Sequence, residues 1–315
     1  MRRRFALAAA LAGMAGAWAQ PAGPVKLVIG ATPGGTVDTI ARVLAEGMAA
    51  ELRQPVIVVN RPGGNGIVSA DFVARSRPDG TTLLLGTSGL TTLPLLQKAV
   101  PFRVNREFVP AAIVASTPFL LFAGPGSPAS SLANLVAYAR AHPNKLSAAS
   151  GDGATLFANE IFKAAAGVSV LSVNYRGGPQ MITDIAGGAV DFGFLGATAV
   201  LPLARAGKLR VLGVASERRI EIAPEIPTLA EQGVSGQFLE PWLGVLAPAG
   251  TPRATMAALE KAALAAAQSE PFRRKVADIG SLPRQIGADA AVPFMAAEQK
   301  MLEAAAQKAG IVPGE

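Results

Sequence analysis

The 315-residue chain contains no cysteine, one histidine and only 5% aromatic residues. Without cysteine it can form no disulfide, thiolate metal site or thiol nucleophile. His142 stands before Pro143 and belongs to no cluster with metal-ligand spacing, and neither a G-x-S-x-G elbow nor a Walker motif occurs. Lys and Arg are scattered among few aromatic residues, which argues against nucleic-acid binding. We therefore expect no enzyme, no metal or other cofactor and no nucleic-acid partner.

Apolar runs long enough to cross a membrane are also missing from the chain. Its N-terminus instead has the pattern of an export signal, with three arginines at residues 2–4, an apolar run at 5–15 and Ala17-Trp18-Ala19 as a cleavage site. We expect residues 1–19 to be a signal peptide that is removed on export to the periplasm, by the general or the twin-arginine route. The formal charge of +7 includes these three arginines, so the mature chain is nearer +4.

Strand and helix patterns alternate along the remaining chain. Periodic apolar positions predict helices, the clearest of them at residues 36–52. Continuous apolar runs predict strands between the helices, at residues 25–30, 56–60, 82–86, 146–149, 169–173, 190–194 and 209–215. This alternation indicates an α/β fold with mostly parallel sheets, whose ligands bind outside the carboxyl ends of the strands.

Two extended stretches divide the alternating pattern into two series. The first lies within residues 111–123 and is broken by Ser116-Thr117-Pro118, and the second lies at residues 238–247. We expect one lobe of residues 20–122 plus 243–315 and a second lobe of residues 123–242, joined by two hinge strands. This is the architecture of a clamshell that closes around a small molecule.

Four turns between a strand and a helix are rich in glycine and hydroxyl residues. They lie at residues 32–36, 86–89, 150–155 and 175–179. A helix N-terminus offers unpaired N–H groups to an anion, and glycine lets a ligand approach the backbone closely. The alternative is that such turns need glycine and capping residues in any α/β protein. Asp38 would then cap its helix, and Arg176 would lie on the surface.

Several short motifs of the chain occur together in one known family. The motifs are Pro33-Gly34-Gly35 with Asp38 and Ala41-Arg42, Gln54-Pro55-Val56, Asn60-Arg61-Pro62-Gly63, Pro78-Asp79-Gly80, Leu84-Leu85-Gly86-Thr87-Ser88-Gly89, Tyr175-Arg176-Gly177-Gly178, Pro227-Thr228-Leu229-Ala230-Glu231 and Pro248-Ala249-Gly250-Thr251-Pro252. With them, the chain resembles the Bug-type (TctC-like) periplasmic solute receptors of tripartite tricarboxylate transporters, over almost the whole mature length.

The resemblance implies a two-lobed periplasmic binding protein of type II, a Venus-flytrap fold. Such a receptor, here expected to be a monomer, holds a small carboxylate through loop amides, hydroxyls and ordered waters. It delivers the ligand to membrane permease subunits, or in some systems to a sensor-kinase ectodomain. The candidate ligand-binding residues are Ala31, Thr32, Pro33, Gly34, Gly35, Thr36, Asp38, Thr87, Ser88, Gly89, Ser150, Gly151, Asp152, Ala154, Thr155, Tyr175, Arg176, Gly177, Gly178, Leu195 and Gly196.

The chain departs from the family at positions expected to line the ligand cleft. Ala31-Thr32 replaces a common Phe-Pro pair, Leu156 stands near a common His, and Leu195-Gly196 replaces Asp-Asn. The loss of a ring and of polar groups predicts a roomier, less polar pocket for a carboxylate with an apolar or aromatic body. Asp152 leaves open an amino-acid ligand. A periplasmic hydrolase or isomerase with a similar clamshell is the remaining alternative, and the missing base argues against it.

Overall fold

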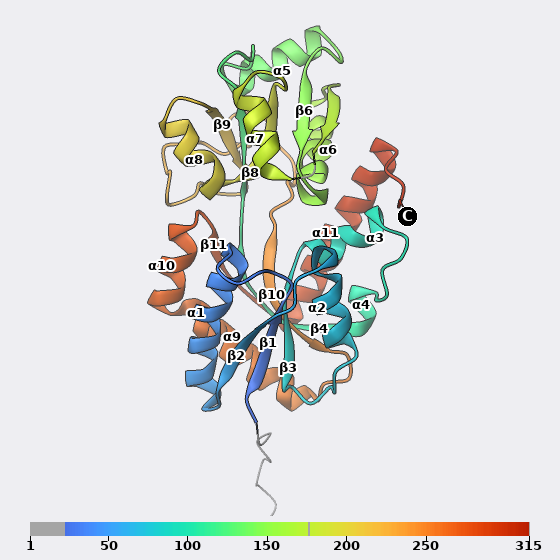
Figure 1. Ribbon diagram of the computed structural model, residues 1–315, viewed down its shortest axis with the longest axis vertical. Helices are drawn as coiled ribbons and strands as arrows, with labels where there is room; N and C mark the ends of the chain where they lie inside the picture. The colour runs from blue at the N-terminus through green and yellow to red at the C-terminus, as the bar shows by residue number, and fades with distance from the viewer. Residues whose placement is uncertain (1–22, 176, 315) are drawn as a thin grey trace, which may run out of the picture.

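The computed structural model describes residues 23–175 and 177–314. The expected signal peptide, 1–19, and the candidate residue Arg176 lie outside the described residues. The chain forms two sheets, one above the other in Figure 1, with a gap between their ends that faces the viewer. Within the described part of the chain, no helix has both the length and the apolar character that a membrane crossing requires.

The lower sheet in Figure 1 has six strands in the order β11-β4-β10-β3-β1-β2. β1, β2 and β3 are parallel, whereas β10 runs antiparallel to β3 and β4, and β11 runs antiparallel to β4. The strands are β1 (Val25–Ile29), β2 (Val56–Asn60), β3 (Thr82–Thr87), β4 (Phe108–Ser116), β10 (Trp242–Pro248) and β11 (Leu282–Gly287). The helices around it are α1 (Thr36–Leu52), α2 (Ile67–Ala74, after the short 3-10 helix Gly64–Gly66), α3 (Gly89–Leu96), α4 (Val104–Glu107), α9 (Arg253–Gln268), α10 (Glu270–Asp278) and α11 (Ala288–Ala309).

The core of the lower part lies on both faces of this sheet. On one face, α1 buries Ile40, Leu44 and Met48, which recur every four residues and so share one side of the helix. They pack with α9 and α10 against β1, β3 and β4. On the other face, α2 and α11 cover Val28, Leu84 and other buried residues.

The upper sheet has five strands in the order β7-β6-β8-β5-β9. β6 is parallel to β7 and β8, whereas β5 is antiparallel to β8 and β9. The strands are β5 (Phe119–Ala123), β6 (Ser147–Ser150), β7 (Leu171–Asn174), β8 (Phe192–Gly196) and β9 (Arg210–Ala215), and the helices are α5 (Leu132–Ala141), α6 (Gly153–Ala166), α7 (Gly178–Ala186) and α8 (Ala197–Arg205). α5 and α6 pack on one face, and α7 and α8 on the other.

An aromatic cluster anchors α6 to the upper sheet. The ring of Phe162 is fully buried and lies 5.9 Å from that of Phe192 and 5.7 Å from that of Phe194. We expect Phe162→Ala to lower the free energy of unfolding by about 3–5 kcal/mol, because it removes buried area and leaves a cavity. Urea denaturation measures this. Val312→Ala, at a position that is 78% exposed, is the control and should change the same quantity by less than about 0.5 kcal/mol. Equal effects of the two substitutions would contradict this assignment of the core.

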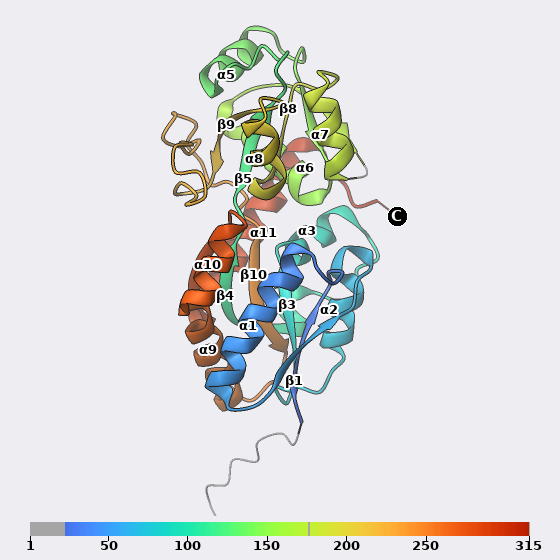
Figure 2. The ribbon, with the colours of Figure 1, turned by 60° about the vertical axis from the view of Figure 1, so that its left-hand side comes forward.

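The chain crosses between the sheets at the turn between β4 and β5 and again between β9 and β10 (Figure 2). The C-terminal helix, α11, is a third link, because it packs on β4 and α3 below and on α6 above. The expected lobe boundaries, at 122/123 and 242/243, stay a prediction. Strand β5 pairs only within the upper sheet, so the topology favours a first crossing at Thr117-Pro118.

The expectation of mostly parallel sheets was right for the direction of most strands, because four strands of each sheet run the same way, but β10, β11 and β5 run against them. The strands next to each crossing, β10 below and β5 above, run against their neighbours, so both sheets are mixed. β11, α3 and α4 were not expected at all. β11 is an edge strand that contains Pro283 and two polar residues, and α3 contains Pro94, so neither has a regular pattern.

Candidate functional site

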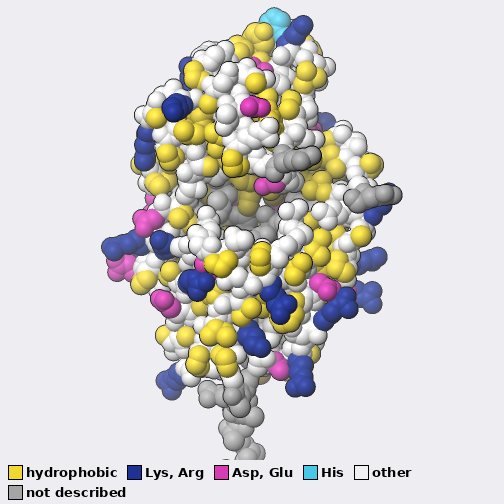
Figure 3. Space-filling view, viewed as in Figure 1, with side chains coloured by type: hydrophobic (Ala, Val, Ile, Leu, Met, Phe, Trp, Pro, Cys, Tyr) yellow, Lys and Arg dark blue, Asp and Glu magenta, His cyan; other side chains and the backbone are white. Residues whose placement is uncertain are grey.

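The turns that follow β1, β3, β6, β7 and β8 lie on the two sides of the gap between the sheets (Figure 1). All candidate residues belong to these turns or to the helix ends that adjoin them. The space-filling view shows the molecule hollowed at this level, between its upper and lower parts (Figure 3). The expected position of the cleft, outside the carboxyl ends of the parallel strands, is where the described structure has this gap.

Asp38, in the first turn of α1, holds the loop that follows β1. Its carboxylate accepts hydrogen bonds from the backbone N–H of Gly34 at 2.9 Å and from Nδ2 of Asn60 at 2.8 Å. Arg42 donates to both carboxylate oxygens, from Nε at 3.0 Å and from Nη2 at 2.9 Å. Asn60 also donates to the carbonyl of Ala31 at 3.0 Å. The carboxylate oxygens of Asp38 therefore accept hydrogen bonds from the protein itself, and these bonds hold the loop after β1 in place.

The charge of Asp38 is strongly favoured in this setting. The hydrogen bonds from Arg42, followed by those from Gly34 and Asn60, hold the pKa of the carboxyl far below its usual range. Gly34 adopts φ +83°, a left-handed conformation that suits glycine, and this turns its N–H toward Asp38. The side chains of Thr32 and Thr36 make no hydrogen bond to any described residue. The first N–H groups of α1 likewise have no partner within the helix, so this loop offers donors to the gap.

The loop after β3 lies next to the loop after β1. Ala31, Asn65 and Thr87 line one cavity of about 120 Å³. The Thr87 hydroxyl accepts a hydrogen bond from the N–H of Gly89 at 3.3 Å. Ser88 is 2% exposed, its N–H donates to the carbonyl of Trp242, and its hydroxyl has no partner among the described residues. The lower part thus brings the first and third loops together.

Three loops of the upper part converge in the same way. The N–H of Tyr175 donates to the carbonyl of Ser150 at 2.8 Å, which joins the ends of β6 and β7. A side chain at Gly151 would collide with the backbone of Gly177 and Gly178, at 2.9 Å. One at Gly178 would touch Leu195 at 3.2 Å.

Two of the upper candidates have structural roles that occupy their side chains. Asp152 caps α6 by accepting from the N–H of Thr155 at 2.8 Å, and the Thr155 hydroxyl accepts from the N–H groups of Gly151 and Asp152. Thr155 is fully buried, so its side chain has no free group for a ligand. The capping alternative therefore describes Asp152 and Thr155 correctly.

The remaining upper candidates bring few charges to the loops above the gap. Ser150 is buried and accepts from Nδ2 of Asn159 at 2.9 Å, so its own proton is free to donate elsewhere. Burial and Asp184 raise the pKa of Tyr175, so this side chain stays neutral. Ala154, Leu195 and Gly196 are half-buried.

Sequence reasoning assigned no role to the residues that support the loops, although Arg42 and Asn60 belong to the quoted motifs. Asn60 and Arg42 hold Asp38 below, and Asn159 holds Ser150 above. Arg42 lies four residues after Asp38, a spacing that indicates a helical ion pair. Asn60 and Asn159 gave no comparable indication, because their partners are brought close only by the fold.

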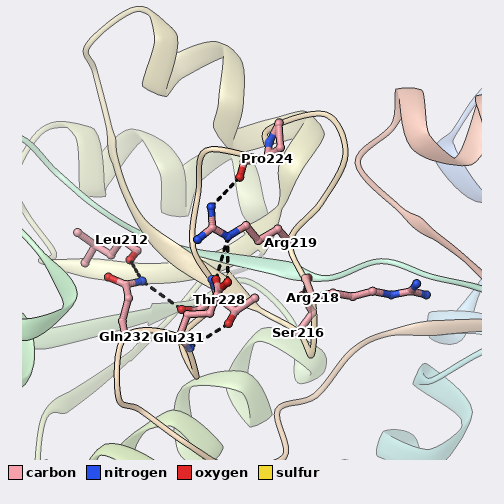
Figure 4. Close-up of polar contacts among 8 residues, drawn as sticks. All are labelled: Leu212, Ser216, Arg218, Arg219, Pro224, Thr228, Glu231 and Gln232. Atoms are coloured by element: carbon pink, nitrogen blue, oxygen red, sulfur yellow. Dashed lines mark hydrogen bonds and ion pairs between the residues drawn. The ribbon is translucent and has the colours of Figure 1, made fainter.

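A polar network outside these loops fixes the segment that returns from β9 to β10 (Figure 4). Glu231 accepts from Arg219 at 2.9 Å and from the N–H of Thr228 at 2.7 Å, and Arg219 lowers the pKa of Glu231. Gln232 donates to the carbonyls of Leu212 and Thr228. These residues turn toward one another, and their bonds are internal. Within residues 23–175 and 177–314 there is also no group of acidic and histidine side chains that could hold a metal ion.

Comparison with known proteins adds an independent finding. Residues 40–311 match the protein family described as the tripartite tricarboxylate transporter family receptor. A UPF0065 protein of Bordetella pertussis is 36% identical over 275 residues, which cover 86% of this chain and 85% of that protein. The structure of R. palustris Rpa4515 with adipate is 32% identical, with a TM-score of 0.77, and covers 93% of this chain and 99% of that one. The structure of the periplasmic binding protein BugD is 27% identical, with a TM-score of 0.74, and covers 94% and 100%.

Proposed function

Because the chain belongs to the tripartite tricarboxylate transporter receptor family, whose members are periplasmic solute receptors and not enzymes, we propose that it binds a small carboxylate between its two lobes and delivers it to a membrane permease. The observation that carries the proposal is the set of loops at the carboxyl ends of the parallel strands, which offer N–H groups and hydroxyls to the gap from both sides. The Asp38 network supports it, because it fixes one of these loops while leaving the donors beside it open.

The ligand we propose is a carboxylate with an apolar or aromatic body. Leu195, Gly178 and Ala31 contribute no polar side chain to the loops, and Thr155 and Asp152 use theirs within the capping box. A tricarboxylate such as citrate would bury additional polar groups without partners, at about 1–3 kcal/mol for each. Adipate, two carboxylates on an apolar chain, is the ligand of the similar R. palustris protein and fits this chemistry.

Capture would require both lobes. Micromolar affinity corresponds to about 8 kcal/mol, whereas one helix N-terminus contributes at most about 2 kcal/mol. The remainder comes from hydrogen bonds to the second lobe and from exclusion of water as the lobes close. We propose that residues 1–19 direct export, that the receptor acts as a monomer, and that the closed form is recognised by permease subunits. A sensor-kinase ectodomain is the second candidate partner, since the same closed form can serve either.

The first test is a thermal-shift screen with adipate, benzoate, malate and citrate. The protein is unfolded and refolded beforehand to remove any carried ligand. A ligand at about 100 times its dissociation constant adds about 2.7 kcal/mol to the free energy of unfolding, which raises the melting temperature by several degrees. We expect adipate or benzoate to raise it and citrate to leave it within about 1 °C. Stabilisation by citrate alone would refute the proposed ligand class, and no response to any carboxylate would refute the proposed function.

A further inference from the structure

A buried carboxyl group lies directly behind the proposed ligand loop after β3. Glu298 of α11 is 4% exposed, and its Oε1 lies 2.7 Å from Oγ1 of Thr91 in α3. The same hydroxyl lies 2.6 Å from the backbone carbonyl of Ser88. Glu298 and Ser88 are thus joined through one hydroxyl group, although 210 positions separate them (298 − 88).

The protons available decide which hydrogen bonds can exist here. A threonine hydroxyl has one proton, so Thr91 cannot donate to Ser88 and to Glu298 at the same time. Both short contacts are hydrogen bonds only if the acid is protonated. Glu298 then donates to Thr91, and Thr91 donates to Ser88. When Glu298 is ionised, it competes with the Ser88 carbonyl for the Thr91 proton, and one contact is lost.

The surroundings of Glu298 favour the protonated acid. Burial raises its pKa from 4.5 to about 7, while hydrogen-bond donors at Thr91 and Trp242 act in the opposite direction. The buried indole N–H of Trp242, on β10, makes no hydrogen bond of good geometry to any described residue. Glu298 lines a cavity of about 560 Å³ whose other charged residues are Glu217, Glu240 and Arg284. Arg284 is paired with Glu240, so no unpaired cation in this lining stabilises the ionised form.

We propose that Glu298 is a positioning residue for the ligand loop, and that its proton links ligand affinity to pH through Thr91 and Ser88. The link to affinity rests on the proposed function, whereas the link to the loop does not. Both contacts of Thr91 require a protonated Glu298. A ligand that binds the loop in this conformation therefore favours the protonated form of Glu298 over the ionised form. Affinity therefore falls as the pH rises through about 7. The stability of the ligand-free protein also falls as the pH rises from about 4.5 to about 7, because the folded state then binds more protons than the unfolded state.

The ligand-free test follows Trp242 fluorescence and amide exchange of residues 87–92 as the pH is raised. The mature protein, from which residues 1–19 have been removed, has Trp242 as its only tryptophan and serves as the background for every variant. We expect a fluorescence transition with a midpoint near 7, together with faster exchange of residues 87–92 above it after correction for the intrinsic rate. Both changes should be lost in Glu298→Gln, whose neutral amide still donates to Thr91. Both should remain in Glu303→Gln, which removes an exposed carboxylate from the same helix.

The second test measures the dissociation constant of adipate at about pH 6 and about pH 8.5, on either side of the expected transition. We expect the background protein to bind adipate about threefold to tenfold more weakly at the higher pH, as one hydrogen bond would give. Glu298→Gln should bind adipate with the same dissociation constant at both pH values. Thr91→Val should bind adipate weakly at both pH values.

Three outcomes separate the two proposals. A transition that persists in Glu298→Gln, or an adipate affinity that is flat with pH in the background protein, would overturn the role of Glu298. Failure of every carboxylate to bind would overturn the proposed function. In that case, amide exchange of residues 87–92 that still changed with pH in the background protein, but not in Glu298→Gln, would support the role of Glu298 in positioning the loop.

Discussion

Replacing Asp38 with alanine is expected to weaken carboxylate binding on the order of 100-fold, the effect of losing several hydrogen bonds from a misplaced loop. The substitution leaves the Gly34 N–H, the Asn60 amide and the Arg42 guanidinium without their common acceptor. The loop after β1 then loses the anchor that holds it against the end of β2. Isothermal titration with adipate measures the affinity. Thermal melting should show that the protein still folds, because the packing of α1 on the sheet is unchanged.

The chain supplies a matched control for this substitution. Asp71 pairs with Arg75 four residues later on α2, through contacts of 2.9 and 3.0 Å, and this pair is exposed. Asp71→Ala therefore removes the same kind of ion pair away from the proposed cleft, and exposed pairs contribute little. We expect it to leave adipate affinity unchanged. Equal losses from Asp38→Ala and Asp71→Ala would show that the cleft is misplaced.

The second large effect is expected on the other side of the gap, at Gly151. A Cβ there would lie 2.9 Å from the backbone of Gly177 and Gly178, which cannot move aside as a side chain can. Gly151→Val should therefore push the loops after β6 and β7 apart and lower affinity on the order of 100-fold. Binding measured beside the circular dichroism of the same sample would show whether the loss is local.

Gly126→Val is the control for the upper lobe, because a Cβ at Gly126 would meet nothing within 4 Å. We expect wild-type affinity and an unchanged melting temperature for this variant. Full affinity in Gly151→Val would mean that the upper loops do not contact the ligand, and the proposal of capture by both lobes would then fail.

Local patterns in the sequence predicted much of the fold. The expected helix at 36–52 and strand at 56–60 match α1 and β2, because four-residue apolar spacing and a run of β-branched residues are local properties. The loops of the expected cleft also lie at the carboxyl ends of the parallel strands, as the predicted order of strands and helices requires. The family resemblance was confirmed by the match over residues 40–311.

Features that depend on distant parts of the chain could not be predicted. The bond between Thr91 and Glu298 joins residues 207 positions apart, and β11 is ordered by pairing with β4. The direction of β5 and β10 follows from where the chain crosses between sheets, which no local pattern records. The ligand roles of the candidate residues remain predictions, and Asp152 and Thr155 show that a cap can have the composition of a binding loop.

The most direct test of capture by both lobes is the distance between the lobes with and without adipate. The chain lacks cysteine, so Val68→Cys on α2 and Thr183→Cys on α7 would carry the only two spin labels. The helix α2 lies below the gap and α7 above it, so the labels lie on opposite sides of the gap (Figures 1 and 2). We expect saturating adipate to shorten the distance between the labels by several ångströms, while a control pair at Val68 and Glu46 within the lower lobe stays unchanged. An unchanged distance in the first pair, in protein saturated with adipate, would contradict the account.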